Sequence, residues 1–150
     1  MTLRFASVSD RDAIFRMLSS FHAVSPFTGR IDSDKVYAEI DAFIEGDNTE
    51  RLLLLSVDGL DRPVGLIALA AVPFLFNHDK TVAELVFWVD PEARRGRRAV
   101  RLIEAAEYWS KKIGASRIVL SHLSGSESVG KMYTKLGYSQ FETGYEKCLS

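Results

Sequence analysis

Five arginines stand within eight positions of each other, directly ahead of a segment with the apolar spacing of an amphipathic helix. A helix N-terminus presents free backbone N–H groups and the positive end of the helix dipole, so it favours anions. Arginines placed there need a compensating anion, and a phosphate suits both guanidinium forks and backbone N–H groups. Gly96, inside the run, would let the backbone approach such an anion closely. The arginines are Arg94, Arg95, Arg97, Arg98 and Arg101.

A simpler interpretation of a charge run is a solvated helix face. At about 100° per residue, Arg94, Arg97, Arg98 and Arg101 would share one face, away from the apolar side of the helix. The sequence contains neither GxxxxGK(S/T) nor GxGxxG, so nucleotide triphosphate and dinucleotide sites of those types are not expected. The formal net charge of -1 argues against a surface that coats nucleic acid. These features favour a different diphosphate carrier as the ligand.

Hydrophobic periodicity predicts the elements that position this run. Strands are expected at 3–7, 51–57, 63–76, 81–89, 117–123 and 138–149. Helices are expected at 9–23, 33–46 and 126–137, and from the arginine run to Gly114. The strand at 81–89 is apolar at both alternating sets of positions, which is typical of a central strand covered on both faces. The order β-α-α-β-β-β-α-β-α-β predicts a mixed α/β domain with some parallel pairing.

Composition sets further limits. A chain of 150 residues is normally one domain, and 47% hydrophobic residues are typical of a globular protein. Cys148 is the only cysteine, which excludes an internal disulfide and a cysteine-based zinc site. The three histidines, His22, His78 and His122, lack metal-ligand spacing, so no metal is expected. Without a signal-peptide core or a run long enough to span a membrane, a cytoplasmic location and no membrane partner are expected.

Two motifs carry a resemblance to a known family. Val89-Asp90-Pro91 ends a strand, and the loop from Arg94 to Ala99 opens the following helix. The segment KMYTKLGYSQFETGY places a tyrosine ahead of a Lys-Leu-Gly-Tyr turn. These features resemble the V-x-P strand end, the R/Q-x-x-G-x-G/A loop and the second motif of the GNAT superfamily of acetyl-CoA-dependent N-acyltransferases. Arg97 departs from the signature, because it stands at the central glycine, and the arginine-rich loop resembles that of some phage-encoded members.

The resemblance covers essentially the whole chain and implies one GNAT-like domain over 1–150. It implies a mixed, mostly antiparallel central sheet with helices on both faces, and acetyl-CoA as co-substrate. The loop would hold the coenzyme pyrophosphate through Arg94, Arg95, Gly96, Arg97, Arg98 and Ala99. The end of the central strand would splay from its neighbour and offer the backbone of Phe87, Trp88 and Val89 to the pantetheine arm and acetyl carbonyl. Ser126 stands where relatives often carry an asparagine near the coenzyme, although a serine there could instead cap a helix.

Two side chains are the candidates for acid–base catalysis. Tyr133 matches the family's general acid, and a phenol with a pKa of about 10 is protonated at neutral pH. Its alternative is a tyrosine packed on a helix. Glu84 is the only charged residue from Thr81 to Val89 and would share a strand face with Val86 and Trp88, where partial burial could make it a base. Its alternative is a strand-end carboxylate paired with an arginine.

The expected function is acetyl transfer from acetyl-CoA to the amine of a small molecule or peptide, directly, in a ternary complex. An alternative is a catalytically weak GNAT-like module that binds acetyl-CoA or a protein, which the missing central glycine favours. A small nucleic-acid binder is disfavoured by the slightly negative net charge, so no nucleic-acid partner is expected. The acceptor is not specified by the sequence, and a homodimer is left open.

Overall fold

The computed structural model of the chain describes residues 2–149 and divides into two compact units, Met1–Val119 and Leu120–Ser150. The first unit holds all of the described strands. They are β1 (Thr2–Phe5), β2 (Arg51–Val57), β3 (Pro63–Pro73), β4 (Lys80–Val89) and β5 (Arg117–Val119). Its helices are α1 (Arg11–Val24), α2 (Ser33–Glu45), α3 (Arg98–Lys112) and the short 3-10 turns η1 (Val8–Asp10) and η2 (Pro91–Ala93). The second unit holds α4 (Glu127–Lys135).

The five strands form one sheet in the order β1-β2-β3-β4-β5. Neighbouring strands are antiparallel from β1 to β4, and β5 runs parallel to β4. The parallel pair is joined by α3, as a strand-helix-strand crossover requires. The sheet is therefore mixed and mostly antiparallel, as predicted.

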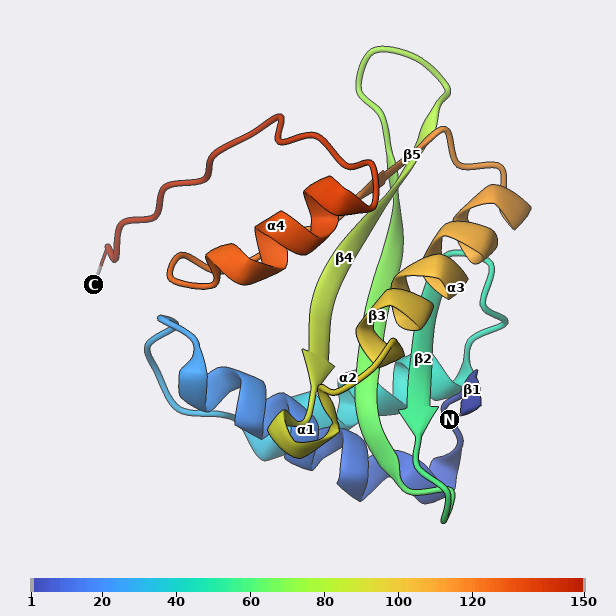
Figure 1. Cartoon of the computed structure of the whole chain (residues 1–150), viewed down its shortest axis with the longest axis vertical. Helices are drawn as coiled ribbons and strands as arrows, with labels where there is room; N and C mark the ends of the chain where they lie inside the picture. Colours follow the sequence, from blue (N-terminus) through green and yellow to red (C-terminus); the bar gives the residue numbers. More distant parts are fainter. Residues whose placement is uncertain (1, 150) are drawn as a thin grey trace. The chain divides into compact units, whose positions relative to one another are not determined.

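Helices cover both faces of this sheet, as seen in Figure 1. Alternation along each strand sends successive side chains to opposite faces. On one face, strand residues pack with residues of α1 and α2 in the cluster Ile14, Met17, Ile40, Leu53, Leu55, Val57, Leu66, Ala68 and Trp88. On the other face lies α3, whose residues Leu102, Ile103 and Ala106 are fully buried. Gly65 of β3 lies tightly against the end of β4, because a Cβ there would lie 3.3 Å from both Trp88 O and Val89 Cγ2. The predicted α/β fold class is confirmed.

In the second unit, α4 ends where the sequence predicts, but the expected strand over 138–149 is not formed. Gly137 adopts a left-handed φ of 93°, and the N–H of Tyr138 bonds back to Tyr133 O (3.0 Å), which closes the helix. The prediction of the last strand was wrong because an alternating pattern supplies only a suitable surface, and a strand also needs backbone partners. Residues 138–149 have no strand partner among the described residues.

The start of α1 is fixed by a buried carboxylate that periodicity did not reveal. Asp10 accepts hydrogen bonds from the backbone N–H and the hydroxyl of Ser7, completing a capping box around η1. Arg4 of β1 donates to both carboxylate oxygens of Asp10, at 2.7 and 3.0 Å. Arg4 also pairs with Asp61, whose side chain is exposed. These bonds join β1 to the first helix of the unit.

We predict that this pair makes stability depend on pH. Burial raises the pKa of Asp10, but the hydrogen bonds from Arg4 and Ser7 outweigh it and hold the pKa below its ordinary value. The stabilisation is therefore present above the unfolded-state pKa, near 4, and is lost as pH falls through the lower folded-state pKa. Asp10→Asn should lower the free energy of unfolding by about 2 kcal/mol at pH 7, and this difference should shrink in acid.

Urea unfolding of both proteins between neutral and acid pH measures this difference. The control is Asp61→Asn, which removes only the exposed partner of Arg4 and should change stability by less than about 0.5 kcal/mol. A difference between wild type and Asp10→Asn that stays constant down to the acid limit would refute the linkage.

Candidate active site

A β-bulge in β4 decides where Glu84 lies. Val86 pairs with Ala68 of β3 and Glu84 pairs with Leu69, so Leu85 between them has no register partner. The extra residue shifts the alternation of the strand by one position. Glu84 is therefore in register with Leu69, on the α3 face, and not on the face of Val86, as predicted. The predicted shared face with Trp88 is wrong for the same reason, although Glu84 is half-buried.

The two neighbours of β4 accompany it over different lengths. Antiparallel pairing with β3 extends from Lys80 to Val89, whereas parallel pairing with β5 joins only Thr81–Ala83 to Arg117–Val119. From Glu84 onward, β4 therefore has β3 as its hydrogen-bonded neighbour within this unit. Phe87, Trp88 and Val89 belong to this later part of the strand.

The end of β4 is held by a buried carboxylate, Asp90, which is 4% exposed. Its oxygens accept from Trp88 Nε1 (2.8 Å) and from the two terminal nitrogens of Arg16 on α1 (3.1 and 2.8 Å). Its own N–H donates to Val64 O (2.8 Å). Hydrophobic periodicity does not single out Asp90 or Arg16. The signal in the sequence that could have revealed Asp90 is an acidic residue placed directly after an apolar strand.

The loop after Asp90 begins with η2 and turns at Gly96, which adopts a left-handed φ of 79°. A Cβ on Gly96 would meet nothing within 4 Å, so the glycine is needed for the left-handed turn and not to avoid a collision with a neighbour. Arg97 is the N-cap of α3 and makes no side-chain cap hydrogen bond. The first intrahelical bond runs from Arg101 N to Arg97 O (2.9 Å), and the earlier N–H groups of the helix have no backbone partner within residues 2–149.

The arginines of the loop do not share one face, because α3 begins at Arg98 and the residues before it are not helical. Arg94 donates from Nε to Val89 O (2.9 Å) and lies over the ring of Trp88, 4.9 Å from its centre. Arg97 turns along the helix and pairs with Glu104 at 3.0 Å, where both side chains are exposed. The predicted single arginine face is therefore wrong.

Arg98 points toward the sheet. Its guanidinium donates to Ser56 Oγ (2.6 Å), Val57 O (3.1 Å) and Ala93 O (3.3 Å). Ser56 and Val57 end β2 and are buried, so these bonds attach the first turn of α3 to the sheet. The side chain of Arg98 therefore has a structural role, while its backbone N–H and that of Ala99 belong to the open first turn of the helix.

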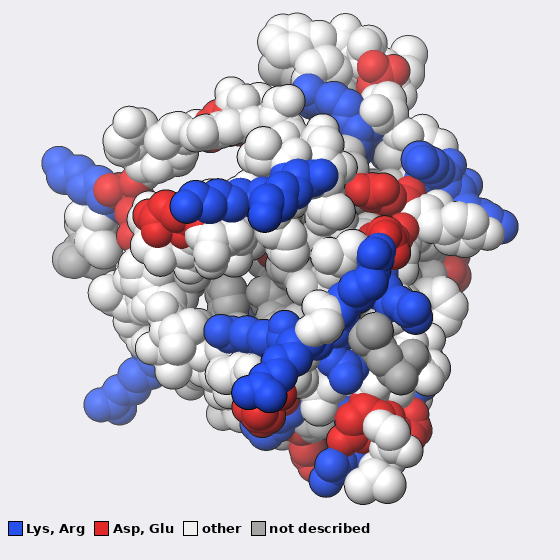
Figure 2. Space-filling view, viewed as in Figure 1, with Lys and Arg blue, Asp and Glu red and all other residues white. Residues whose placement is uncertain are grey.

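Arg95 and Arg101 are the two exposed arginines of the cluster without a side-chain hydrogen bond or ion pair among residues 2–149. Arg101 lines a shallow groove of about 580 Å³ with Arg97 and Glu104, beside residues of β1. Figure 2 shows basic side chains gathered where the η2–α3 loop lies in Figure 1. Positive charge is thus concentrated at the start of α3 on a molecule with a formal net charge of -1.

In the second unit, the hydroxyl of Tyr133 donates to Ser121 O at 2.9 Å. Its ring lies near the rings of His122 and Tyr138, with centroids 6.4 and 5.9 Å away. His122 packs closely on α4, because a Cβ on Gly130 would lie 2.6 Å from its Nε2. These contacts hold the phenol in a defined place within its own unit.

Ser126 is the N-cap residue of α4, and its side chain makes no cap hydrogen bond. It therefore takes the predicted position at the helix start without the predicted capping bond.

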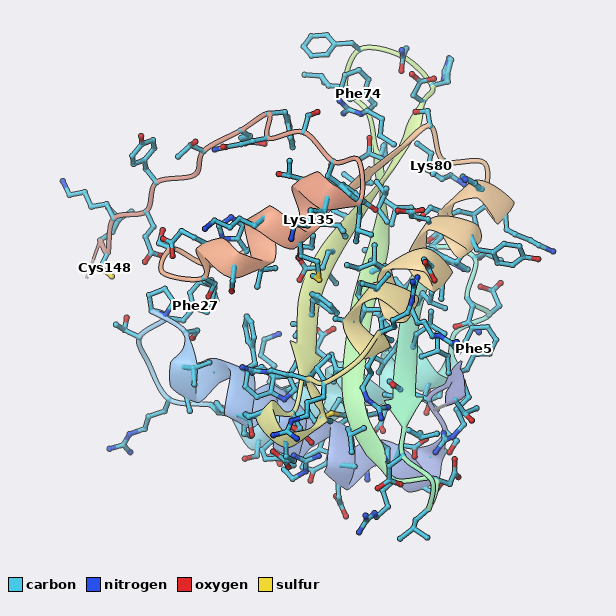
Figure 3. The ribbon with its side chains drawn as sticks, in the orientation of Figure 1. Phe5, Phe27, Phe74, Lys80, Lys135 and Cys148 are labelled. Atoms are coloured by element: carbon cyan, nitrogen blue, oxygen red, sulfur yellow. The ribbon has the colours of Figure 1, made fainter. Side chains whose placement is uncertain are left out.

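Phe27, which is labelled in Figure 3, belongs to the loop between α1 and α2. Its ring packs near that of Phe21, and Phe21 in turn packs against Trp88.

Between residues 2 and 149, no three His, Cys, Asp or Glu side chains come together as they would around a metal ion. No helix within this range is both long and apolar enough to cross a membrane.

Comparison with known proteins gives the family. Residues 14–138 match the sequence model of the acetyltransferase (GNAT) family. No curated protein sequence matches the chain significantly. Among solved structures, a tetramutant of a Bacillus halodurans protein is 21% identical, with a TM-score of 0.83 over 99% of this chain and 100% of that one. An acetyltransferase of Trypanosoma brucei is 19% identical, with a TM-score of 0.76 over 99% of both chains.

A further similar structure is the glucosamine-6-phosphate N-acetyltransferase of Arabidopsis thaliana, which is 15% identical, with a TM-score of 0.77 over 99% of this chain and 98% of that one. At such identities the likeness concerns the fold, whereas the family match concerns the sequence of most of the chain. The predicted membership of the GNAT superfamily is thereby confirmed. The chain belongs to the acetyltransferase (GNAT) family and is an enzyme of the N-acetyltransferase class.

Proposed function

We propose that the enzyme transfers an acetyl group from acetyl-CoA directly to an amine acceptor while both are bound. The family uses acetyl-CoA as its co-substrate. The observation that carries the proposal for this chain is the start of α3, where a left-handed Gly96, an uncapped first turn and several arginines meet at the end of β4. Uncapped N–H groups and guanidinium forks are the donors that bind phosphate oxygens.

The departure at Arg97 is compatible with pyrophosphate binding. Arg97 has a φ of -100°, a conformation that needs no glycine. Its side chain turns away along α3 to Glu104, so the guanidinium need not fill the space beside the loop backbone. We assign the pyrophosphate to the loop backbone from Gly96 to Ala99, assisted by the side chains of Arg94 and Arg95.

Direct transfer needs an amine nitrogen that attacks the thioester carbonyl carbon, so that a C–N bond forms and the C–S bond breaks. The proton released by the amine passes to a base, for which Glu84 is the half-buried candidate on β4. The departing thiolate takes a proton from an acid, for which Tyr133 is the candidate. A backbone N–H near the bulge at Leu85 could stabilise negative charge on the carbonyl oxygen.

A second candidate function is a module that binds acetyl-CoA with little catalysis. The arginine at the central glycine position favours it. It shares the coenzyme site with the leading proposal and differs from it only in acyl transfer to an amine.

We predict that the protein releases free thiol from acetyl-CoA when a suitable amine is present. The assay incubates the protein with acetyl-CoA and a panel of polyamines, amino sugars, amino acids and peptides, and follows thiol release and acetylated product. Calorimetric titration with CoA measures binding separately. Binding without transfer to any acceptor would favour the module, and absence of binding would overturn the coenzyme assignment.

We predict that Arg95 contributes to coenzyme binding and that Arg98 contributes to stability. Arg95→Ala should raise the Kd for CoA about tenfold, because a charged phosphate contact is lost, while leaving stability unchanged. Arg98→Ala should lower the free energy of unfolding by about 2 kcal/mol, because Ser56 and Val57 lose their donor. Titration with CoA and urea unfolding are measured on both variants. The prediction would be contradicted if the two variants changed the Kd for CoA equally and also changed the free energy of unfolding equally.

We predict that Tyr133→Phe lowers kcat about 100-fold, because the proton for the thiolate is lost. Tyr145→Phe is the matched control, since it removes the hydroxyl of a tyrosine that is 95% exposed and should leave kcat within about twofold. Steady-state kinetics over pH measures both. Unchanged turnover of Tyr133→Phe across pH would assign the phenol to packing alone.

A further inference from the structure

Asp90 is the most heavily bonded buried carboxylate next to the arginine loop. Three donors reach it: both terminal nitrogens of Arg16 and the indole nitrogen of Trp88. A carboxylate that is 4% exposed is costly to bury unless such donors surround it. The three bonds therefore fix the direction of the indole relative to α1 and to the end of β4.

The indole held by Asp90 in turn supports Arg94. The guanidinium of Arg94 lies 4.9 Å from the centre of the Trp88 ring, and its Nε donates to Val89 O at 2.9 Å. Phe21 of α1 packs edge-on against Trp88, with centroids 6.4 Å apart. Two contacts on β4 thus hold Arg94, and no described residue binds its terminal nitrogens.

Without this support, Arg94 would be mobile among like charges. Arg95, Arg97 and Arg98 follow within four residues and repel another cation. A long side chain that must be ordered when its ligand binds reduces affinity, and one that is already held avoids that cost. The face of an indole and a carbonyl oxygen attract a guanidinium without neutralising it, so its charge stays available to an anion.

We propose that Asp90 and Arg16 are positioning residues for coenzyme binding, which hold Trp88 so that Arg94 stays beside the loop that takes the pyrophosphate. The proposal rests on the proposed function, because it assumes that the loop binds the coenzyme. Neither residue touches the coenzyme in this arrangement. Their effect passes through the indole and the guanidinium of Arg94.

The test uses Asp90→Asn in the full chain. The amide keeps the size of the side chain and can still accept from Trp88, but it presents an NH2 group to Arg16 and loses the charge. The matched control is Asp10→Asn, which breaks another two-pronged arginine pair on a carboxylate that is also 4% exposed, away from β4. Thermal unfolding, calorimetric titration with CoA and steady-state kinetics are measured on both.

We expect both variants to lose thermal stability, and only Asp90→Asn to bind CoA about tenfold more weakly. The KM for acetyl-CoA should rise by a similar factor, with kcat at saturation within about twofold of wild type. Arg16→Gln, whose side chain is half exposed and therefore more tolerant of change, should act in the same direction. Arg16→Lys should restore part of the affinity.

Wild-type affinity for CoA in a folded Asp90→Asn or Arg16→Gln variant would overturn the proposal. So would an equal loss of affinity in Asp10→Asn, because the effect would then follow stability alone. If Asp90→Asn does not fold, Arg16→Gln decides. If wild-type protein itself does not bind CoA, the proposed function fails, and that result is distinct from a difference between variants.

Discussion

The start of α3 is positively charged at the end of the helix where the dipole is already positive, and this constraint governs the surrounding structure. No acidic residue stands in its first turn, and its N-cap makes no side-chain bond to the helix. An ordinary helix would be stabilised there by an acid or a polar cap. This helix instead keeps its first N–H groups open and depends on packing against the sheet, through Leu102 and Ile103, for its place.

The protein accommodates the like charges by giving each arginine a different neighbour. Arg94 rests on an indole and a carbonyl, Arg97 pairs with Glu104, and Arg98 reaches the end of β2. The guanidinium groups are thereby separated before any ligand binds. Of these contacts, the exposed pair with Glu104 contributes least, because solvent screens it. The contacts of Arg94 and Arg98 are those that connect the loop to the sheet.

Periodicity predicted α1, α2 and α3 and the strands β2, β3 and β4, because each of them contributes apolar residues to the buried core. It could not predict the side on which Glu84 lies, since the bulge at Leu85 depends on pairing with β3 and leaves no mark in the spacing. The start of α3 was predicted too early, because four arginines at helical intervals gave the spacing of a helix face. Gly96 adopts a left-handed conformation, so the residues before it cannot belong to the same helix. The network of Asp90 was missed because its partner Arg16 is distant in sequence.

The arginine in place of the signature glycine illustrates how a local departure can leave a site intact. A glycine is indispensable where φ is positive or where a Cβ would collide with a neighbour. In this loop the positive φ falls at Gly96, one residue earlier, and Arg97 takes an ordinary conformation. The side chain of Arg97 pairs with Glu104 further along the helix, and so it lies away from the open N–H groups. The backbone donors and the arginine charge can therefore coexist at the same turn.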